Sequence, residues 1–416
     1  MLQQRVLRLK NNSDSRGNLN IGLIEAFFSA LMVGAGETYL PAYVLSAGLG
    51  EIFAGILSTL PILSGAVIQL FAPKMYSRMK NPKKWVVLTV LLQALAFIPL
   101  IYFTLTRSPD FWSLFLVLSL YWAAGFASGP AWNYWMGRLV DPSAGGVYFA
   151  KRAQVTQLGI LLGLILGGVA LHNKVELLPF TSVFTSLFVL AFLSRIISTL
   201  LLSQQSYLKE WQDLPRLGFR DSLKTFWSHS QKKKFFLLLV PYQASVFITG
   251  PFVIPYFLAQ IKMDYGTLMV AVSALFVGKI MTLQLAQRVL KHVSPQKIFL
   301  FGAASVAPLP MLWAFSTEIK FILLLQFVSG MSWALIEYGL SLVFFKDLNE
   351  AEKVPFTMSY NFLNSLAILG GTFVGSQVLF WLGTHLVSYK ILFFVGGFFR
   401  ILFCGPLLAL SSRTIK

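Results

Sequence analysis

The segment GETYLPAYV, residues 36–44, returns 214 residues later as GPFVIPYFL, residues 250–258. Gly36 aligns with Gly250 at this interval, and Pro41 aligns with Pro255. Further pairs recur along the chain: Gly65 with Gly278, Gly163 with Gly370, and Arg195 with Arg400. The interval stays close to half of the 416 residues, as expected for two related halves that differ by small insertions. A repeat of this kind in a long apolar chain is typical of secondary transporters, whose substrate site lies between the halves.

The composition places this repeat in a membrane. Hydrophobic residues make up 56% of the chain and charged residues only 12%, against about 25% charged in soluble domains. Chains in lipid cross it as helices or closed barrels, and the apolar runs here have the length of helices, about 20 residues. We therefore expect an all-α integral membrane protein with spans near residues 20–45, 51–71, 85–105, 110–137, 147–171, 180–203, 235–260, 265–288, 297–315, 319–345, 355–381 and 388–411.

Six of these twelve spans fall in each half, so the repeat predicts two pseudo-symmetric six-helix bundles. The expected domains are an N-terminal bundle, residues 1–203, a connecting loop, residues 204–234, and a C-terminal bundle, residues 235–416. The connecting loop alternates aromatic and charged residues, so part of it is expected to form an amphipathic helix on the membrane surface.

The net charge of +18 is distributed along the chain in a way that predicts its orientation. With both termini in the cytoplasm, the inner segments carry 26 of the 34 Lys and Arg residues and the outer loops carry five. This asymmetry follows the positive-inside rule and predicts cytoplasmic termini. Nucleic-acid binding would need a contiguous basic patch, so anionic lipid headgroups are the expected partners of the excess charge.

The sequence offers no catalytic or metal-binding set. Its one cysteine, Cys404, lies in the last span, and the four histidines are scattered. No metal-binding pair at helical spacing and no nucleophile–histidine–acid arrangement is visible. We therefore expect neither an enzyme nor a cofactor or metal, and we expect a monomer.

Several strings resemble the major facilitator superfamily, in a bacterial branch: GPAWNYWMGRLVDPSAGGVYFAKR at residues 129–152 and SVFITGPFVIPYFLA at residues 245–259. The resemblance covers nearly the whole chain. The loop FAPKMYSRMKNPKKW at residues 71–85 keeps the basic residues of the family's signature loop but lacks its acidic member. The resemblance implies alternating access, in which the two bundles rock about a central site lined by spans 1, 4, 7 and 10.

Breaks in spans 1 and 7 mark those helices independently. Glycine loosens a helix and proline removes one of its hydrogen bonds. Interruptions at matching places in both halves are the best sequence indicator of a transporter's binding site. We therefore predict hinges at Gly36, Pro41, Gly250, Pro251 and Pro255.

Charged residues inside the spans are costly and usually face a cavity or a partner. Glu37 has no acidic counterpart in the second half, where Pro251 stands. It is either a structural carboxyl or the residue that carries a coupling proton or cation. Glu337 and Lys279 are expected to pair across the cavity, as a structural bridge or as a switch.

Other charges are expected to be structural. Glu25 could pair with Arg152, and the repeat-related Arg195 and Arg400 are expected to bond backbone carbonyls.

Neutral polar and aromatic residues complete the candidate site. Amide groups facing lipid would be left without hydrogen bonds, so they should face the protein interior, where they either join helices or contact substrate. The candidates are Trp132, Asn133, Tyr242, Gln243, Tyr256, Trp333 and Tyr338, with the i, i+3 pairs Gln154/Gln157 and Asn361/Asn364.

These residues predict a secondary transporter in the bacterial inner membrane that works by alternating access, coupled to protons or another ion. An aromatic cavity with few fixed charges favours a small organic or amphipathic solute, and efflux as the direction. The alternatives are uptake of a sugar or metabolite, and a lipid flippase with the same fold.

Overall fold

The computed structural model describes residues 2–79, 81–106, 109–140, 142–176, 181–206, 224, 227–228, 230–290, 293–347 and 350–413. Most of the connection 204–234, including the expected amphipathic helix, lies outside the described residues. The described part of the chain is helical throughout its regular elements. The prediction of an all-α membrane protein is therefore confirmed.

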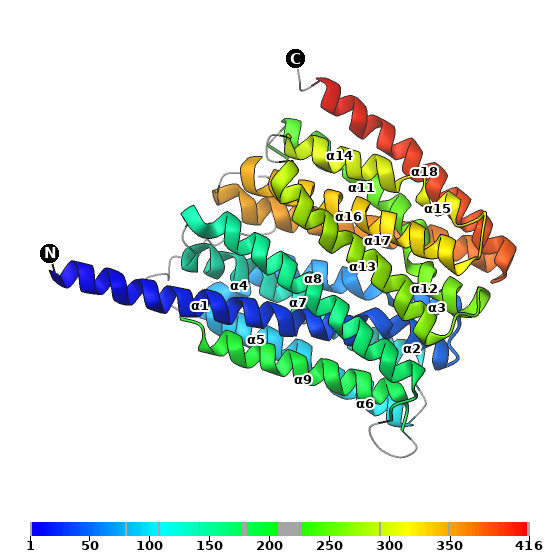
Figure 1. Cartoon of the computed structure of the whole chain (residues 1–416), viewed down its shortest axis with the longest axis horizontal. Coiled ribbons are helices and arrows are strands. Elements are labelled where there is room, and N and C mark those ends of the chain that lie inside the picture. Colours follow the sequence, from blue (N-terminus) through cyan, green and yellow to red (C-terminus); the bar gives the residue numbers. More distant parts are fainter. Residues whose placement is uncertain are drawn as a thin grey trace.

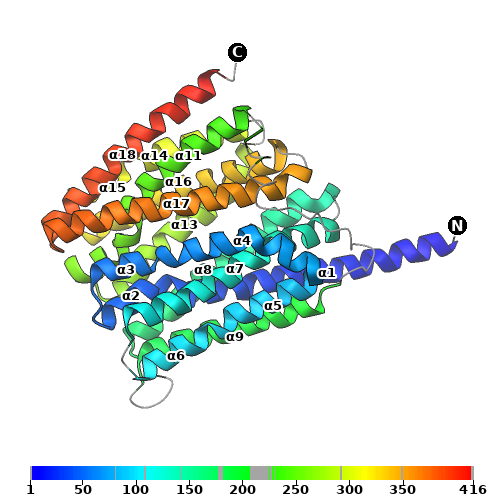
Figure 2. The same ribbon diagram turned by 180° about the vertical axis from the view of Figure 1, so that it is seen from behind.

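The first half contains α1 (Leu2–Ala35), η1 (Glu37–Tyr39), α2 (Leu40–Ser46), α3 (Glu51–Leu57), α4 (Leu60–Met79), α5 (Pro82–Leu95), α6 (Phe97–Thr106), α7 (Phe111–Leu139), α8 (Pro142–His172) and α9 (Val183–Gln204). The second half contains α11 (Ser230–Thr249), η3 (Gly250–Phe252), α12 (Val253–Pro255), η4 (Tyr256–Gln260), α13 (Tyr265–Val289), α14 (Pro295–Val306), α15 (Leu309–Leu312), α16 (Ile319–Asp347), α17 (Glu350–Leu382) and α18 (Leu386–Arg413). Figures 1 and 2 show the two halves packed side by side, with the axes of their long helices roughly aligned.

Among the described residues, eleven segments are long and apolar enough to cross a membrane. They correspond to every expected span except the ninth, predicted at residues 297–315. There α14 ends at Val306 and the four-residue α15 follows, because Pro308 and Pro310 interrupt the helix. The chain nevertheless makes a twelfth pass at this position, in two short helices.

The start of α1 and the end of α18 lie on the same side of the bundle (Figure 1). We call this side the terminal end and the opposite side the far end. Helices at the far end begin with polar caps: Asp110 for α7, Ser182 for α9 and Asp264 for α13 each accept a hydrogen bond from a backbone N–H of the first turn. Such caps satisfy backbone donors that the helix itself leaves free.

Small residues hold the first helix of each half against the fifth. A Cβ atom on Gly34 of α1 would collide with the backbone of Ile160 in α8. In the second half, a Cβ atom on Gly371 of α17 would collide with the backbone of Ala244 in α11. The repeat therefore carries a repeated close packing of helices, as small residues allow in membranes.

Candidate functional site

Both helices predicted to bend are interrupted, and at matching places. In the first half, α1 ends at Ala35, and the 3₁₀ turn η1 follows Gly36 before α2 resumes with Pro41 in its first turn. In the second half, the 3₁₀ turn η3 begins at Gly250 with Pro251.

The second-half interruption continues further. Pro255 ends α12, and a π-helical turn, η4, completes the span. Because the π turn adds a residue per hydrogen-bonded ring, it rotates the side chains beyond it relative to a continuous helix. The two breaks are geometrically alike at their start and differ in this π turn.

Glu37 begins η1, directly after the break in the first span. Its Oε2 accepts a hydrogen bond of 2.7 Å from the hydroxyl of Tyr121 in α7, and the same hydroxyl lies 3.2 Å from Met32 Sδ. Among the described residues, the Glu37 carboxylate makes no ion pair. The break in the first span therefore presents a carboxyl group to span 4 with a neutral phenol as its direct partner.

Glu25 is the contrasting carboxylate of the same helix. It is only 3% exposed, its Oε2 lies 2.6 Å from Arg152 Nη2, and its Oε1 accepts a 3.0 Å hydrogen bond from Ser198. Arg195 Nη1 lies 4.0 Å from Oε1 on the other side. The expected pairing of Glu25 with Arg152 is present in the structure and is part of a larger network.

Arg195 extends that network across three helices. Its guanidinium donates to Ser29 of α1 at 2.6 Å, to Ser198 at 3.1 Å and to the side-chain oxygen of Gln93 in α5. The repeat-related Arg400 donates instead to the Val246 carbonyl at 3.0 Å and to the Thr249 hydroxyl at 2.6 Å. The expected carbonyl contact is thus seen for Arg400, whereas Arg195 bonds side chains and faces an acid.

Lys279 and Glu337 are in contact. Lys279 Nζ of α13 lies 2.5 Å from Glu337 Oε1 of α16, with side chains 13% and 45% exposed. Both helices belong to the second half and pack against each other, so the pair joins neighbours within one bundle. The predicted pairing of Lys279 with Glu337 is therefore confirmed, and whether it acts as a structural bridge or as a switch stays a prediction.

The predicted aromatic residues divide into two groups. Trp132 is half-buried, and its ring lies 4.6 Å from the Arg152 guanidinium, which attaches it to the Glu25 network. Trp333 and Tyr338 of α16 are half-buried, and Asn133 is exposed. All four stay candidates for contact with a solute.

Tyr242 and Tyr256 form the second group and are each 1% exposed. The Tyr242 hydroxyl donates to the Ala303 carbonyl at 3.0 Å, and the Tyr256 ring packs on Tyr389 and Phe393. These contacts favour packing inside the second half over contact with a solute. The sequence indicated helix and residue type but not the face of the helix on which each ring lies.

One predicted amide joins the two halves. Asn361 Nδ2 of α17 donates to Gln69 Oε1 of α4 at 3.0 Å. Three further amide oxygens are buried and accept no hydrogen bond from the described residues: those of Asn364 (the i+3 partner of Asn361), Gln157 of α8 and Gln243 of α11. Gln154 is half-buried. A buried acceptor without a partner is costly, so the three oxygens are candidate contacts for a solute that donates hydrogen bonds.

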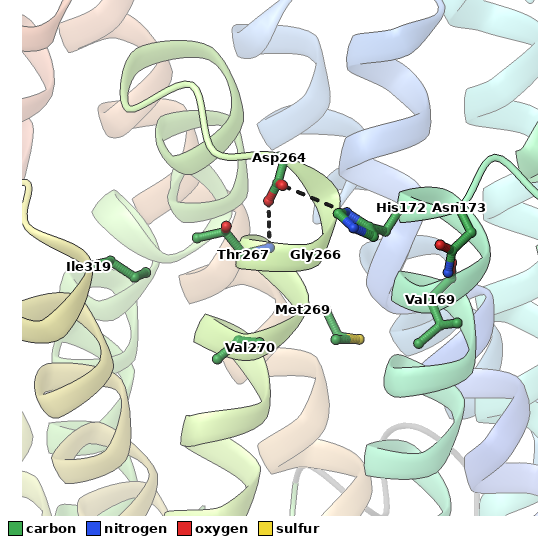
Figure 3. A pocket seen from close by; sticks show the side chains of 9 residues that line it. All are labelled: Val169, His172, Asn173, Asp264, Gly266, Thr267, Met269, Val270 and Ile319. Carbon is green, nitrogen blue, oxygen red and sulfur yellow. Dashed lines mark hydrogen bonds and ion pairs between the residues drawn. The ribbon is translucent and has the colours of Figure 1, made fainter.

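A cavity of about 390 Å³ opens at the far end, between α8 and α13 of the two halves. Figure 3 shows His172 of α8 directed toward Asp264, whose carboxylate also caps α13. The cavity is lined by Val169, His172, Asn173, Asp264, Gly266, Thr267, Met269, Val270 and Ile319. None of these residues was among the site residues predicted from the sequence.

Two further contacts escaped the sequence analysis. Tyr121 is the hydrogen-bond partner of Glu37. From the sequence alone, an aromatic residue in a span cannot be assigned to the lipid-facing surface, to the core or to a site. Glu51 of α3 accepts hydrogen bonds from Gln260 and from Tyr389, 209 and 338 residues away. No spacing pattern in one sequence reports contacts of that separation.

Comparison with known proteins is consistent with this architecture. A profile of the Major Facilitator Superfamily matches residues 22–372. No curated protein matches the sequence.

Similar solved structures include the following three. A mutant of the nucleoside transporter NupG superposes with a TM-score of 0.72 at 14% identity, covering 94% of this chain and 99% of that one. A bacterial homolog of the human lysosomal transporter Spinster, crystallised inward-facing and unoccupied, gives 0.65 at 10% identity, with 97% of each chain covered. A variant of the Escherichia coli fucose:proton symporter FucP gives 0.62 at 14% identity, covering 92% and 98%.

Proposed function

Because the chain belongs to the major facilitator superfamily, it is a multi-pass secondary transporter of a small molecule, and we propose that it couples solute movement to protons through Glu37. The carrying observation is the position of this carboxyl at the break of the first span, with Tyr121 of α7 as its direct partner. A carboxyl that is not fixed in a salt bridge can gain and lose a proton without breaking an ion pair. Glu25, in contrast, is held by two arginines and serves as structure.

The proposed movement uses the two interrupted spans. The regular helical hydrogen bonds are already missing at the 3₁₀ turns η1 and η3. Gly250 and Pro251 lie within η3, and Gly36, Pro41 and Pro255 lie close to one or the other turn. A bend there costs less than a bend in a continuous helix. Since Glu37 lies on one of these turns, a change in its protonation acts directly on the segment that bends.

The solute is proposed to be a small organic or amphipathic molecule that leaves the cell. Half-buried Trp132 and Trp333 offer aromatic surfaces, and the Gln157, Gln243 and Asn364 oxygens offer acceptors for its N–H or O–H groups. Uptake of a polar metabolite is the second candidate. The unpartnered amide oxygens favour it, and the structural likeness extends to a nucleoside transporter and a fucose:proton symporter.

The proposed location is the bacterial inner membrane, with both termini in the cytoplasm. The support is the distribution of Lys and Arg, 26 of 34 in the segments assigned to the inside. Under this orientation the terminal end is cytoplasmic and the far end faces the outside.

Purified protein is first screened by thermal shift against nucleosides, hexoses and lipophilic cations, because a bound solute raises the apparent stability. The solute that shifts the protein is then followed in sealed proteoliposomes with and without a pH gradient. Glu37→Gln keeps the shape and hydrogen-bonding ability of the side chain but cannot release a proton. We expect this variant to bind and exchange solute while losing accumulation driven by the gradient.

Two variants serve as controls. Tyr121→Phe removes the hydrogen bond but leaves the titratable group, so gradient-driven transport should be reduced and not abolished. Glu337→Gln neutralises a carboxylate in the other half and should keep coupling. If Glu37→Gln accumulates solute as the wild type does, Glu37 is not the coupling residue.

A further inference from the structure

Glu51 and Asp264 occupy equivalent positions in the two halves. Glu51 is the first residue of α3, and Asp264 caps α13, which are the helices that open the second span of each half. The two acids are 213 residues apart, the same interval that relates Gly65 to Gly278. Both therefore stand at the far end, at the same place in the repeat.

Each of these carboxylates contacts the opposite half. Glu51 of the first half accepts hydrogen bonds of 2.9 and 3.2 Å from Gln260 Nε2, and one of 2.6 Å from the Tyr389 hydroxyl. Asp264 of the second half lies 3.7 Å from His172 Nδ1 of the first (Figure 3). Each half therefore provides one of these carboxylates, and the opposite half provides its partner.

The Glu51 contact is the more buried of the two, and its partners are held in place by further contacts. Tyr389 is fully buried, and Gln260 is fixed by a second hydrogen bond, of 3.0 Å, to the Thr384 carbonyl. Gln260 ends the π turn η4, so the extra residue of that turn helps to set the direction of its amide. The Asp264 and His172 side chains are more than half exposed, where an ion pair contributes little.

Apolar packing surrounds both contacts. The Phe252 ring of η3 fits against Gly55 of α3, and Met269 of α13 fits against Gly168 of α8. Any side chain at either glycine would collide with its neighbour. The halves are thus closely packed at the far end, and Glu51 lies beside the Phe252 contact on α3.

We propose that Glu51 is the latch that holds the far end of the transporter closed, and that the pair between His172 and the repeat-related acid Asp264 is a weaker second latch. Separating the halves at this end removes all three hydrogen bonds of the Glu51 carboxylate, and these are charge-assisted bonds of the stronger kind. Opening therefore requires water to replace them. Glu51 favours the closed state whatever the solute or coupling ion.

The latch is tested by the distance between the halves at the far end. Spin labels are placed at Ser46→Cys in the first half and Thr317→Cys in the second, both exposed at this end, with Cys404→Ser removing the natural cysteine. Double electron–electron resonance on the full-length protein in lipid nanodiscs, without added solute, then reports the ratio of open to closed molecules. Glu51→Ala should raise that ratio about tenfold or more, as expected for the loss of hydrogen bonds to a charged group.

Matched variants separate the latch from a general loss of structure. Asp110→Ala removes another helix-starting carboxylate at the far end, whose hydrogen bonds to Trp112 and Ser113 stay within its own half. It should leave the distance distribution unchanged. Tyr389→Phe removes one hydroxyl and keeps the buried ring, and His172→Ala breaks the second latch. Both should move the ratio in the same direction as Glu51→Ala, by a smaller factor.

Unchanged distances in both Glu51→Ala and Tyr389→Phe would overturn the proposal. An equal shift in Asp110→Ala would also overturn it, because the effect would then come from helix capping. A larger shift for His172→Ala than for Glu51→Ala would reverse the assigned order of the two latches.

Discussion

Arg195 and Arg400 occupy equivalent positions in the two halves of the repeat, but their surroundings differ. Arg195 lies in a network with Glu25, Arg152, Gln93 and Ser29, in which an acid balances the cations. Among the described residues, Arg400 donates to the Val246 carbonyl and the Thr249 hydroxyl and makes no ion pair. Both halves therefore hold a buried arginine that braces its bundle, and among the described residues the arginine of the first half is the one that faces a carboxylate. Glu37, the residue proposed to carry the coupling proton, lies in the same half as the Arg195 network.

The largest expected effect tests that difference directly. Glu25→Gln leaves Arg152 and Arg195 without their acid, and removing one partner of a buried ion pair typically costs about 3–5 kcal/mol. The unfolding transition in detergent, followed by heat or by denaturant, should show that loss. Glu318→Gln, an exposed acid at the far end, should show almost none.

The double variant Glu25→Gln/Arg152→Gln turns the first half into the arrangement of the second, a single buried arginine with neutral acceptors. It should recover part of the lost stability, because the remaining cation is placed as Arg400 is. Additive losses in the double variant would mean that the two side chains do not act as a pair.

Replacing each arginine by methionine gives the next largest contrast. Arg195→Met removes hydrogen bonds to side chains on three helices and one of the two cations that face Glu25. The free energy of unfolding is therefore expected to fall by roughly 2–3 kcal/mol. Arg400→Met exchanges a cation with two neutral acceptors for an apolar side chain of similar length, and the cost should stay under about 1.5 kcal/mol. Equal losses at the two positions, measured side by side by the same unfolding assay, would remove the asymmetry on which the comparison rests.

The sequence predicted the fold because the fold depends on apolar length and on the repeat. Span 9 was placed but not its division, since Pro308 and Pro310 lie inside a run that is otherwise apolar enough. The residue types of the site were also predictable: Glu37, Glu337 and Lys279 are costly in lipid and had to have partners.

The geometry of those partners was less predictable. The Lys279–Glu337 pair follows from charge, but charge alone does not say how far each side chain is exposed, and Glu337 is 45% exposed. Tyr242 and Tyr256 were expected at the cavity because span 7 lines it, yet only one face of a helix can line a cavity, and apolar residues occur on every face of this span. Neither a period nor a composition distinguishes the faces of such a helix.

The second half has its own ion pair, and it should contribute less than that of the first. Because Glu337 is 45% exposed, water screens its attraction to Lys279, and the pair should contribute at most about 1 kcal/mol. Lys279→Met and Glu337→Gln, alone and combined, form a double-mutant cycle on unfolding stability. A coupling as large as that between Glu25 and Arg152 would show that the second half holds an equivalent network.

The smallest expected effect concerns the helix caps, one from each half. Hydrogen bonds from the side chain and backbone N–H of Thr267 lower the pKa of Asp264 below its ordinary value, and those from the side chain and backbone N–H of Ser113 do the same for the pKa of Asp110. A cap with a lowered pKa contributes its full stability above the unfolded value of about 3.9. As the pH falls below that value, the unfolded chain binds its proton first, so the contribution is lost. Asp264→Asn and Asp110→Asn should therefore each make the unfolding midpoint slightly less dependent on pH between about 5 and 3. Of the two variants, Asp264→Asn should also alter the distance between the halves at the far end, because Asp264 faces His172 of the opposite half. A change in that distance with Asp110→Asn would show that helix capping, and not contact between the halves, controls the far end.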